Sequence, residues 1–216
     1  MWQQRYSVWA RLIAFGFRLL YNELAWLYDP VSWVVSLGLW RRWQQTALAY
    51  MPPGGSVLEV GFGPGHLLLD LATAGYRPVG LDLSPNMLRL AQRRLRRRGA
   101  AANLVRGRAS ALPFAARAFD AVVLTFPTPF VYDPVWICHL ERVLKPGGRL
   151  IVVETSFLTR RDLPARFVEW LSRITGERRP FPDLTGLLSQ VGLQARRESV
   201  SVESSTVRLV IADKPQ

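Results

Sequence analysis

Three glycines at every second position form the part of the sequence whose residue types and spacing best suit chemistry. Gly61, Gly63 and Gly65 directly follow a short apolar run at residues 56–60. Glycine lets a backbone turn sharply and approach a ligand that a Cβ atom would push away. Asp82 ends the next apolar run about 20 positions later, where a carboxylate can accept hydrogen bonds from both hydroxyls of a ribose. The pattern therefore predicts a site for an adenosine-containing cofactor.

Two residues argue against a nicotinamide or flavin dinucleotide in this site. The sixth position of the glycine motif of dinucleotide-binding proteins needs Gly or Ala for close helix packing, and here it is His66. Glu59 stands near the end of the first apolar run, where its charge would repel a pyrophosphate and attract a cation. S-adenosylmethionine carries both an ammonium and a sulfonium group, so it is the cofactor that we expect.

Four segments in order resemble the motifs of the class I S-adenosylmethionine-dependent methyltransferases, of the kind that modifies small molecules, lipids and quinones. The resemblance covers roughly residues 54 to 212. The matching segments are 57–65, 80–88, 111–114 together with 118–122, and 140–150. Any one of them could arise by chance, whereas four in the same order are specific.

The resemblance implies roles for the residues around the glycine loop. Glu59 would orient the methionine amino group, the three glycines would line the methionine and ribose, and Asp82 would hold the ribose hydroxyls. Leu83 and Met87 would flank the adenine. In the third motif many relatives have an acidic residue before the small residue that faces the adenine, but this chain has Arg108 there. Contacts from the Ala109 backbone or the Ser110 side chain would have to replace it.

The acceptor of the methyl group is expected to meet the chain after the fourth strand. This segment differs from the Asn-Pro-Pro-Tyr type of enzymes that methylate amino groups of DNA, RNA and protein amides. Phe126, Phe130 and Tyr132 predict either an aromatic wall for a cationic or apolar acceptor or a structural loop with buried rings. The acceptor would enter between this loop and an N-terminal segment that carries Tyr21 and Tyr28.

Few residues are candidates for catalysis. Methyl transfer from a sulfonium is an in-line displacement, so the protein mainly has to position the nucleophile and exclude water. His66 and Tyr132 are weak candidates for a catalytic role, and His139, the other histidine, suits a structural one. With two histidines, a single cysteine at Cys138 and no clustered carboxylates, we expect no metal.

Composition narrows the class of partner and the compartment. The chain of 216 residues has a formal net charge of +12 and 49% hydrophobic residues, enough for a substantial core. Arginine fills nearly all cationic positions, which weakens the argument from charge for nucleic acid, and no aromatics of the kind that stack bases are interleaved with the arginines. A single cysteine fits a reducing cytoplasm. Nucleic acid is thus an unlikely partner, and the oligomeric state is open.

Residues 1–52 form a region distinct from the methyltransferase domain expected at 53–216. Six of the eight tryptophans lie in this region, mixed with arginines. One interpretation is a helical lid over the cofactor cleft; the other is an interfacial segment in which residues 1–50 touch the inner surface of a membrane. No apolar stretch reaches the length needed to span a bilayer.

Apolar runs alternate with helical patterns from Ser56 onward, which predicts an α/β fold with a doubly wound, Rossmann-like sheet. The resemblance implies seven strands in the order 3-2-1-4-5-7-6. Helices are expected at 65–74, 85–98, 134–144, 162–174 and 183–190, and strands at 56–60, 78–82, 103–106, 119–125, 149–154, 194–202 and 205–212.

These patterns predict methyl transfer from S-adenosylmethionine to a small-molecule or lipid-like acceptor, with a phospholipid amine or a quinone-type ring favoured. Two alternatives stay open. Net charge alone favours an RNA methyltransferase. Arg108 alone favours a non-catalytic module that binds S-adenosylmethionine.

Overall fold

The computed structural model describes residues 16, 19, 24–160, 162, 168 and 182–216. Tyr21 and most of the helix expected at 162–174 lie outside these residues. The helices are η1 (Ala25–Leu27), α2 (Tyr28–Ser36), α3 (Trp40–Gln45), η2 (Thr46–Tyr50), α4 (His66–Thr73), α5 (Pro85–Arg97), η3 (Pro129–Tyr132), α6 (Pro134–Val143) and α8 (Leu184–Gln190). The strands are β1 (Ser56–Val60), β2 (Arg77–Asp82), β3 (Asn103–Arg106), β4 (Phe119–Thr125), β5 (Leu144–Leu158), β6 (Gln194–Val202) and β7 (Ser205–Asp213).

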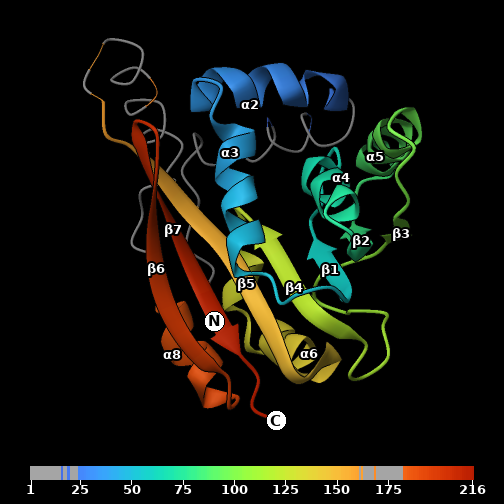
Figure 1. The fold of residues 1–216 in the computed structure, drawn as a ribbon, viewed down its shortest axis with the longest axis vertical. Helices are drawn as coiled ribbons and strands as arrows, with labels where there is room; N and C mark the ends of the chain where they lie inside the picture. The colour runs from blue at the N-terminus through green and yellow to red at the C-terminus, as the bar shows by residue number, and fades with distance from the viewer. Residues whose placement is uncertain (1–15, 17–18, 20–23, 161, 163–167, 169–181) are drawn as a thin grey trace.

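The strands form one seven-stranded sheet in the order β3-β2-β1-β4-β5-β7-β6. The pairs among the first five strands are parallel, whereas β7 runs antiparallel to both β5 and β6. This confirms the expected fold and strand order. In Figure 1, β1 and β4 point towards the end of the molecule that α2 crosses, so this end holds the carboxyl ends of the parallel strands.

The sequence prediction for β5 was too short. The strand begins at Leu144 instead of residue 149 and continues to Leu158. Leu144 pairs with Phe119, and the pairing with β4 then shifts, so that Ala121 lies opposite Arg149. The turn-forming residues 145–148 therefore lie between two pairs of this ladder, and they are part of the strand. At the other end, antiparallel pairing with β7 extends β5 to Leu158.

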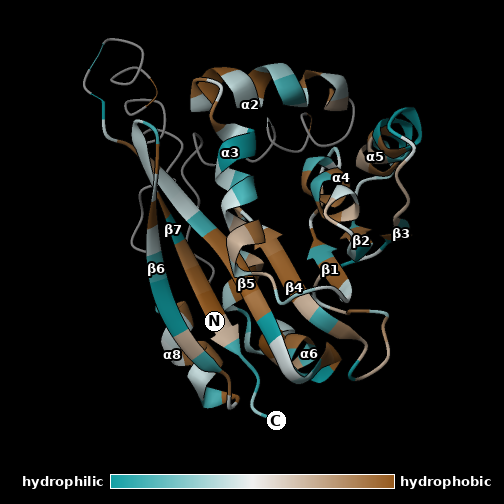
Figure 2. Ribbon diagram, in the orientation of Figure 1, coloured by the Kyte–Doolittle hydropathy of each residue, from teal (hydrophilic) through white to brown (hydrophobic). Residues whose placement is uncertain are grey.

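Hydrophobic clusters bury both faces of the sheet, and successive side chains of a strand point alternately into one cluster and the other. Val122 and Leu124 of β4 pack in a cluster with residues of α6 and α8. Ala121 and Val123 face the opposite cluster, which includes Trp43 of α3 and Leu67 of α4. Figure 2 shows hydrophobic colouring over most of β7 and over the half of β4 that ends in its arrowhead, in contrast to the more hydrophilic edge strand β6.

The segment from α3 to η2 packs directly on the sheet. Trp43 is 4% exposed, and its indole Nε1 donates a hydrogen bond to Ser205 Oγ at 2.8 Å. Ala47 and Met51 lie in the same buried cluster. The chain then passes through Pro52 and Pro53 into β1. This anchoring fixes where α2 lies, which is across the carboxyl ends of the strands (Figure 1).

Candidate cofactor site

The glycine loop lies between β1 and α4 and leaves open space for a ligand. The backbone of Gly63 has a φ of +53°, in the left-handed region, and a Cβ atom added there or at Gly61 would meet nothing within 4 Å. Gly65 serves packing instead, because a Cβ atom there would come within 2.7 Å of Ala91 Cβ in α5. The first two glycines thus form a floor that a ligand can approach, and the third lets α4 and α5 come together.

Asp82 is fixed at the end of β2 by backbone groups. Its Oδ2 accepts a hydrogen bond from Gly63 N at 2.9 Å, and its Oδ1 accepts one from Ser84 N at 2.8 Å. Burial raises the pKa of Asp82, and these backbone N–H groups oppose the rise. Each carboxylate oxygen can accept more than one hydrogen bond, so the group remains able to bind ribose hydroxyls.

Glu59 is 1% exposed, and neither of its carboxylate oxygens has a well-formed hydrogen bond among the described residues. Burial raises the pKa of Glu59 well above its ordinary value, and the charges of Asp82 and Asp70 add to the rise. The backbone N–H of Leu68 opposes it only in part. A buried carboxylate without a donor is costly unless a cation or donor joins it. It therefore fits the ammonium group of S-adenosylmethionine.

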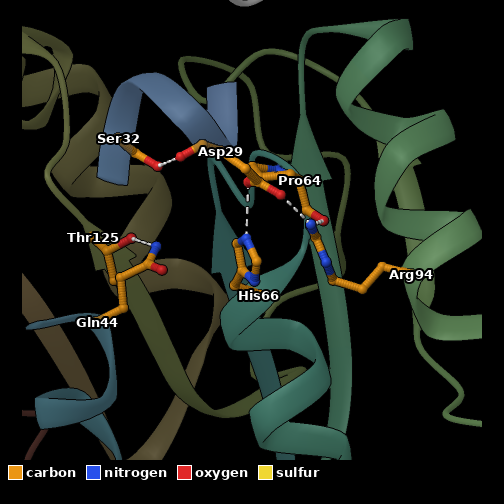
Figure 3. A network of polar contacts seen from close by, with 7 residues as sticks. All are labelled: Asp29, Ser32, Gln44, Pro64, His66, Arg94 and Thr125. Atoms are coloured by element: carbon orange, nitrogen blue, oxygen red, sulfur yellow. Dashed lines mark hydrogen bonds and ion pairs between the residues drawn. The ribbon is translucent and has the colours of Figure 1, made fainter. Parts of the chain in front are cut away.

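A polar network joins α2 to the glycine loop (Figure 3). Asp29 Oδ1 lies 2.9 Å from His66 Nε2, and Asp29 Oδ2 lies 2.5 Å from an Arg94 guanidinium nitrogen. Arg94 also donates a hydrogen bond to the carbonyl oxygen of Pro64, within the loop. Burial raises the pKa of Asp29, but its contacts with His66 and Arg94 outweigh this effect and lower it. We call these four residues the latch, because they tie α2 to the loop and to α5.

The three aromatic residues expected to line the acceptor lie in two different places. Phe126 has a φ of +50°, and its ring centroid lies 4.4 Å from that of Trp40 in α3. Phe130 packs edge-on against Trp136 of α6, with ring centroids 5.5 Å apart. Tyr132 donates a hydrogen bond to Glu154 Oε1 at 3.3 Å. Of the three, only Phe126 thus contacts Trp40 of α3, and Tyr28 lies on the same residue, with its ring centroid 6.4 Å from that of Trp40.

The residues expected near the adenine differ in their exposure. Leu83 is 52% exposed beside Asp82, whereas the side chain of Met87 is fully buried. Ala109 is half-buried, and both Arg108 and Ser110 are exposed. Leu83 is therefore the member of this group that offers the most surface to a ligand, and Met87 contributes to the core beneath α5.

Sequence reasoning missed Asp29, Arg94, Trp40 and Gln44. Asp29 and Trp40 lie in residues 1–52, which were interpreted as a whole from their tryptophans and arginines. Arg94 belongs to a run of arginines that is typical of a solvated helix end. Gln44 donates a hydrogen bond from Nε2 to Thr125 Oγ1 at 3.0 Å (Figure 3). No short motif marks these residues, because their partners lie far away in the sequence.

Comparison with known proteins finds sequences similar to this chain. Residues 57–148 match the family described as "Methyltransferase domain". The chain is 35% identical over 157 residues to the demethylmenaquinone methyltransferase of Renibacterium salmoninarum, across 71% of this chain and 65% of that protein. It is 36% identical over 144 residues to the ubiquinone/menaquinone biosynthesis C-methyltransferase of Syntrophotalea carbinolica, across 64% and 61%. The chain is therefore similar to the class I S-adenosylmethionine-dependent methyltransferases in sequence and in strand order.

Solved structures of methyltransferases share the fold. A structure from Methanosarcina mazei described as a SAM-dependent methyltransferase has a TM-score of 0.57 and is 26% identical, covering 79% of this chain and 97% of that one. Phosphoethanolamine N-methyltransferase 2 of Haemonchus contortus in complex with S-adenosyl-L-methionine has a TM-score of 0.62 and is 18% identical, covering 83% and 53%. The chain spans less than two thirds of the length of the two curated relatives named above.

Proposed function

We propose that this methyltransferase transfers the methyl group of S-adenosylmethionine to a carbon of a quinone-type ring. The observation that carries the proposal is the similarity, at about one residue in three, to curated relatives that are named for this type of acceptor. The glycine floor, the buried carboxylate of Glu59 and the backbone-held Asp82 support the choice of cofactor.

The lid supports an aromatic acceptor. Trp40 and Phe126 meet at the carboxyl end of β4, and Phe126 is held in a left-handed backbone conformation that a bulky residue rarely adopts. Strain of this kind is often found at ligand sites. Flat aromatic side chains can pack against a quinone ring and exclude water, which are the two things that an in-line methyl transfer requires of the protein.

Tyr132 is a poor candidate for a general base. Burial and the neighbouring Glu154 raise the pKa of its hydroxyl well above the ordinary value. The hydroxyl is therefore protonated at neutral pH and donates its hydrogen bond to Glu154. We propose a structural role for Tyr132, while the ring proton that the acceptor loses on methylation passes to water or to another base.

The lid also supports contact with a membrane, which is where a lipid-like quinone would be met. Between residues 24 and 34 the residues with the most exposed surface are apolar: Leu24, Trp26, Pro30, Val31, Trp33 and Val34. Asp29 is half-buried, with 45% of its side chain exposed. Tryptophan is suited to the headgroup region of a bilayer. No helix among the described residues is both long and apolar enough to cross a membrane. We propose a peripheral position at the cytoplasmic face, with these side chains in the interface.

The acceptor can be tested with labelled cofactor. The purified chain is incubated with methyl-labelled S-adenosylmethionine and, in separate reactions, with reduced demethylmenaquinone or with phosphatidylethanolamine vesicles. We expect label on the quinone ring. Label on the phospholipid alone would contradict the proposed acceptor, and so would an activity that rises with pH as an amine loses its proton.

The membrane contact can be tested by co-sedimentation with vesicles that contain anionic lipid. We expect the double variant Trp26→Ser, Trp33→Ser to bind vesicles at least tenfold more weakly than the parent chain, because both exposed indoles are lost. A matched control is Trp43→Phe, since Trp43 is buried on the sheet. Equal binding by the double variant and the parent chain would contradict the proposal.

A further inference from the structure

Gln44 has an unused hydrogen-bonding atom in the interior of the protein. The residue is 7% exposed, its Nε2 is bonded to Thr125, and its Oε1 is buried without a donor among the residues that the structure describes. Buried polar groups are nearly always paired, so an unpaired amide oxygen calls for a ligand. In Figure 3 this oxygen points away from Thr125 and in the direction of His66.

Other buried polar atoms without partners lie near the carboxyl ends of the central strands β1 and β4. In the described part of the chain there are six such side-chain atoms, and five of them belong to Trp40, Gln44, Glu59 and His66. Thr125, which holds Gln44, is the last residue of β4, and Glu59 pairs with Val123 two positions before it. Trp40 contacts Phe126, the residue after Thr125, and His66 directly follows the glycine loop. The sixth atom belongs to Trp136 in α6, on the other face of the sheet.

The chemistry of these atoms is mostly that of acceptors. The carboxylate of Glu59, when it is ionised, and the amide oxygen of Gln44 can only accept hydrogen bonds. His66 faces the carboxylate of Asp29 through Nε2, so a neutral His66 carries its proton on Nε2 and offers Nδ1 as an acceptor. An ammonium group has three N–H donors, and three residues with open acceptors are present. Trp40 Nε1 is the one donor of the set, which suits a carboxylate.

We propose that Gln44 and His66 bind the ammonium group of the cofactor together with Glu59, and that Trp40 donates a hydrogen bond to the cofactor's carboxylate. This inference rests on the proposed use of S-adenosylmethionine. Trp40 and Gln44 both lie on α3, which is continuous with the lid. Residues of α3 then recognise the amino-acid end of the cofactor together with Glu59 and His66, while Asp82 recognises the ribose at its adenosine end.

The test compares two ligands that differ only at that end. S-adenosylhomocysteine has the amino-acid group, whereas 5′-methylthioadenosine keeps the adenosine and thioether and lacks it. Their affinities are measured by calorimetry for the parent chain and for Gln44→Leu. We expect Gln44→Leu to bind S-adenosylhomocysteine about tenfold more weakly, because a hydrogen bond to a charged group is lost. The affinity for 5′-methylthioadenosine should stay unchanged, and this also shows that the variant is folded.

Gln45→Leu is the matched control, because Gln45 is the next residue of α3 and its Nε2 is bonded to Asp70 instead. We expect this variant to keep the parent ratio of the two affinities. A Gln44→Leu variant that binds both ligands as the parent does, or loses both equally, would overturn the inference and leave the proposed function standing. A parent chain that binds neither ligand would overturn the proposed function as well.

Discussion

Asp82 and Asp29 both lie beside the glycine loop, yet they are held there by different kinds of group. Asp82 is fixed by backbone N–H groups of Gly63 and Ser84, which are close to the glycine motif itself. Asp29 is fixed by the side chains of His66 and Arg94, on two helices far along the chain. Backbone contacts are present whenever the strands form, whereas side-chain contacts can break while the sheet stays intact. Asp82 therefore depends on the sheet alone, whereas the position of α2 depends on side-chain contacts, and we expect α2 to be the part that can move.

The direction of the pKa shifts agrees with this difference. The pKa of Asp82 is raised because burial outweighs its hydrogen bonds. The pKa of Asp29 is lowered because His66 and Arg94 outweigh its burial. A lowered pKa means that the latch is present above the ordinary pKa of an aspartate, near 4, and is lost only as the pH falls through the lowered value. We therefore expect the latch to persist from about pH 5 to 8.

The largest loss of cofactor affinity is expected when Asp82 is changed. Asp82→Ala removes the group that would bind the ribose and also the acceptor for Gly63 N and Ser84 N, so the affinity for S-adenosylhomocysteine should fall about 100-fold. Calorimetry measures the loss. The control is Asp183→Ala at the start of α8, where the carboxylate likewise accepts backbone N–H bonds, from Gly186 among others, but away from the glycine loop. If Asp82→Ala bound as tightly as the parent, the cofactor site would be wrongly placed.

Glu59→Gln tests the cost of the buried charge. The folded chain keeps a proton on Glu59 over a pH range where the unfolded chain has lost it, so stability falls as the pH rises above the ordinary glutamate pKa. We expect the variant to raise Tm by about 2–4 °C at pH 8, roughly 1 kcal/mol, and to leave it unchanged at about pH 3, where both states are protonated. The same variant should bind S-adenosylhomocysteine more weakly. A lower Tm at pH 8 would show that Glu59 stabilises the apo chain.

The smallest effect on cofactor binding is expected when the latch is weakened. Asp29 is 45% exposed, so solvent and salt screen its ion pair with Arg94. We expect Asp29→Asn to speed the release of S-adenosylhomocysteine about threefold at low salt, measured by stopped-flow tryptophan fluorescence, with a smaller difference at high salt. Glu198→Gln is the control, because its ion pair with Arg196 lies on the edge strand β6. An unchanged release rate would show that release of the ligand does not require the latch to break.

The strands, the glycine loop and Asp82 were predictable from the sequence because their patterns are local. Alternating apolar runs and glycine spacing placed β1, β3, β4 and β6 at their observed bounds. The resemblance supplied the strand order. In contrast, Asp29 meets Arg94 across 65 positions and Gln44 meets Thr125 across 81 positions, so no periodic pattern could pair them. The rings of Phe126 and Phe130 were grouped by their proximity in sequence, and the turn between them sends them to different clusters.

The most direct measurement is a calorimetric titration of the purified chain with S-adenosylmethionine and S-adenosylhomocysteine, with NAD as the control ligand. Glu59 would attract a cationic cofactor and repel a pyrophosphate. His66 stands where the glycine motif of dinucleotide-binding proteins has Gly or Ala. We predict micromolar binding of the first two ligands and no binding of NAD. Binding of NAD, or of none of the three, would contradict the central claim that the glycine loop and Asp82 form an S-adenosylmethionine site.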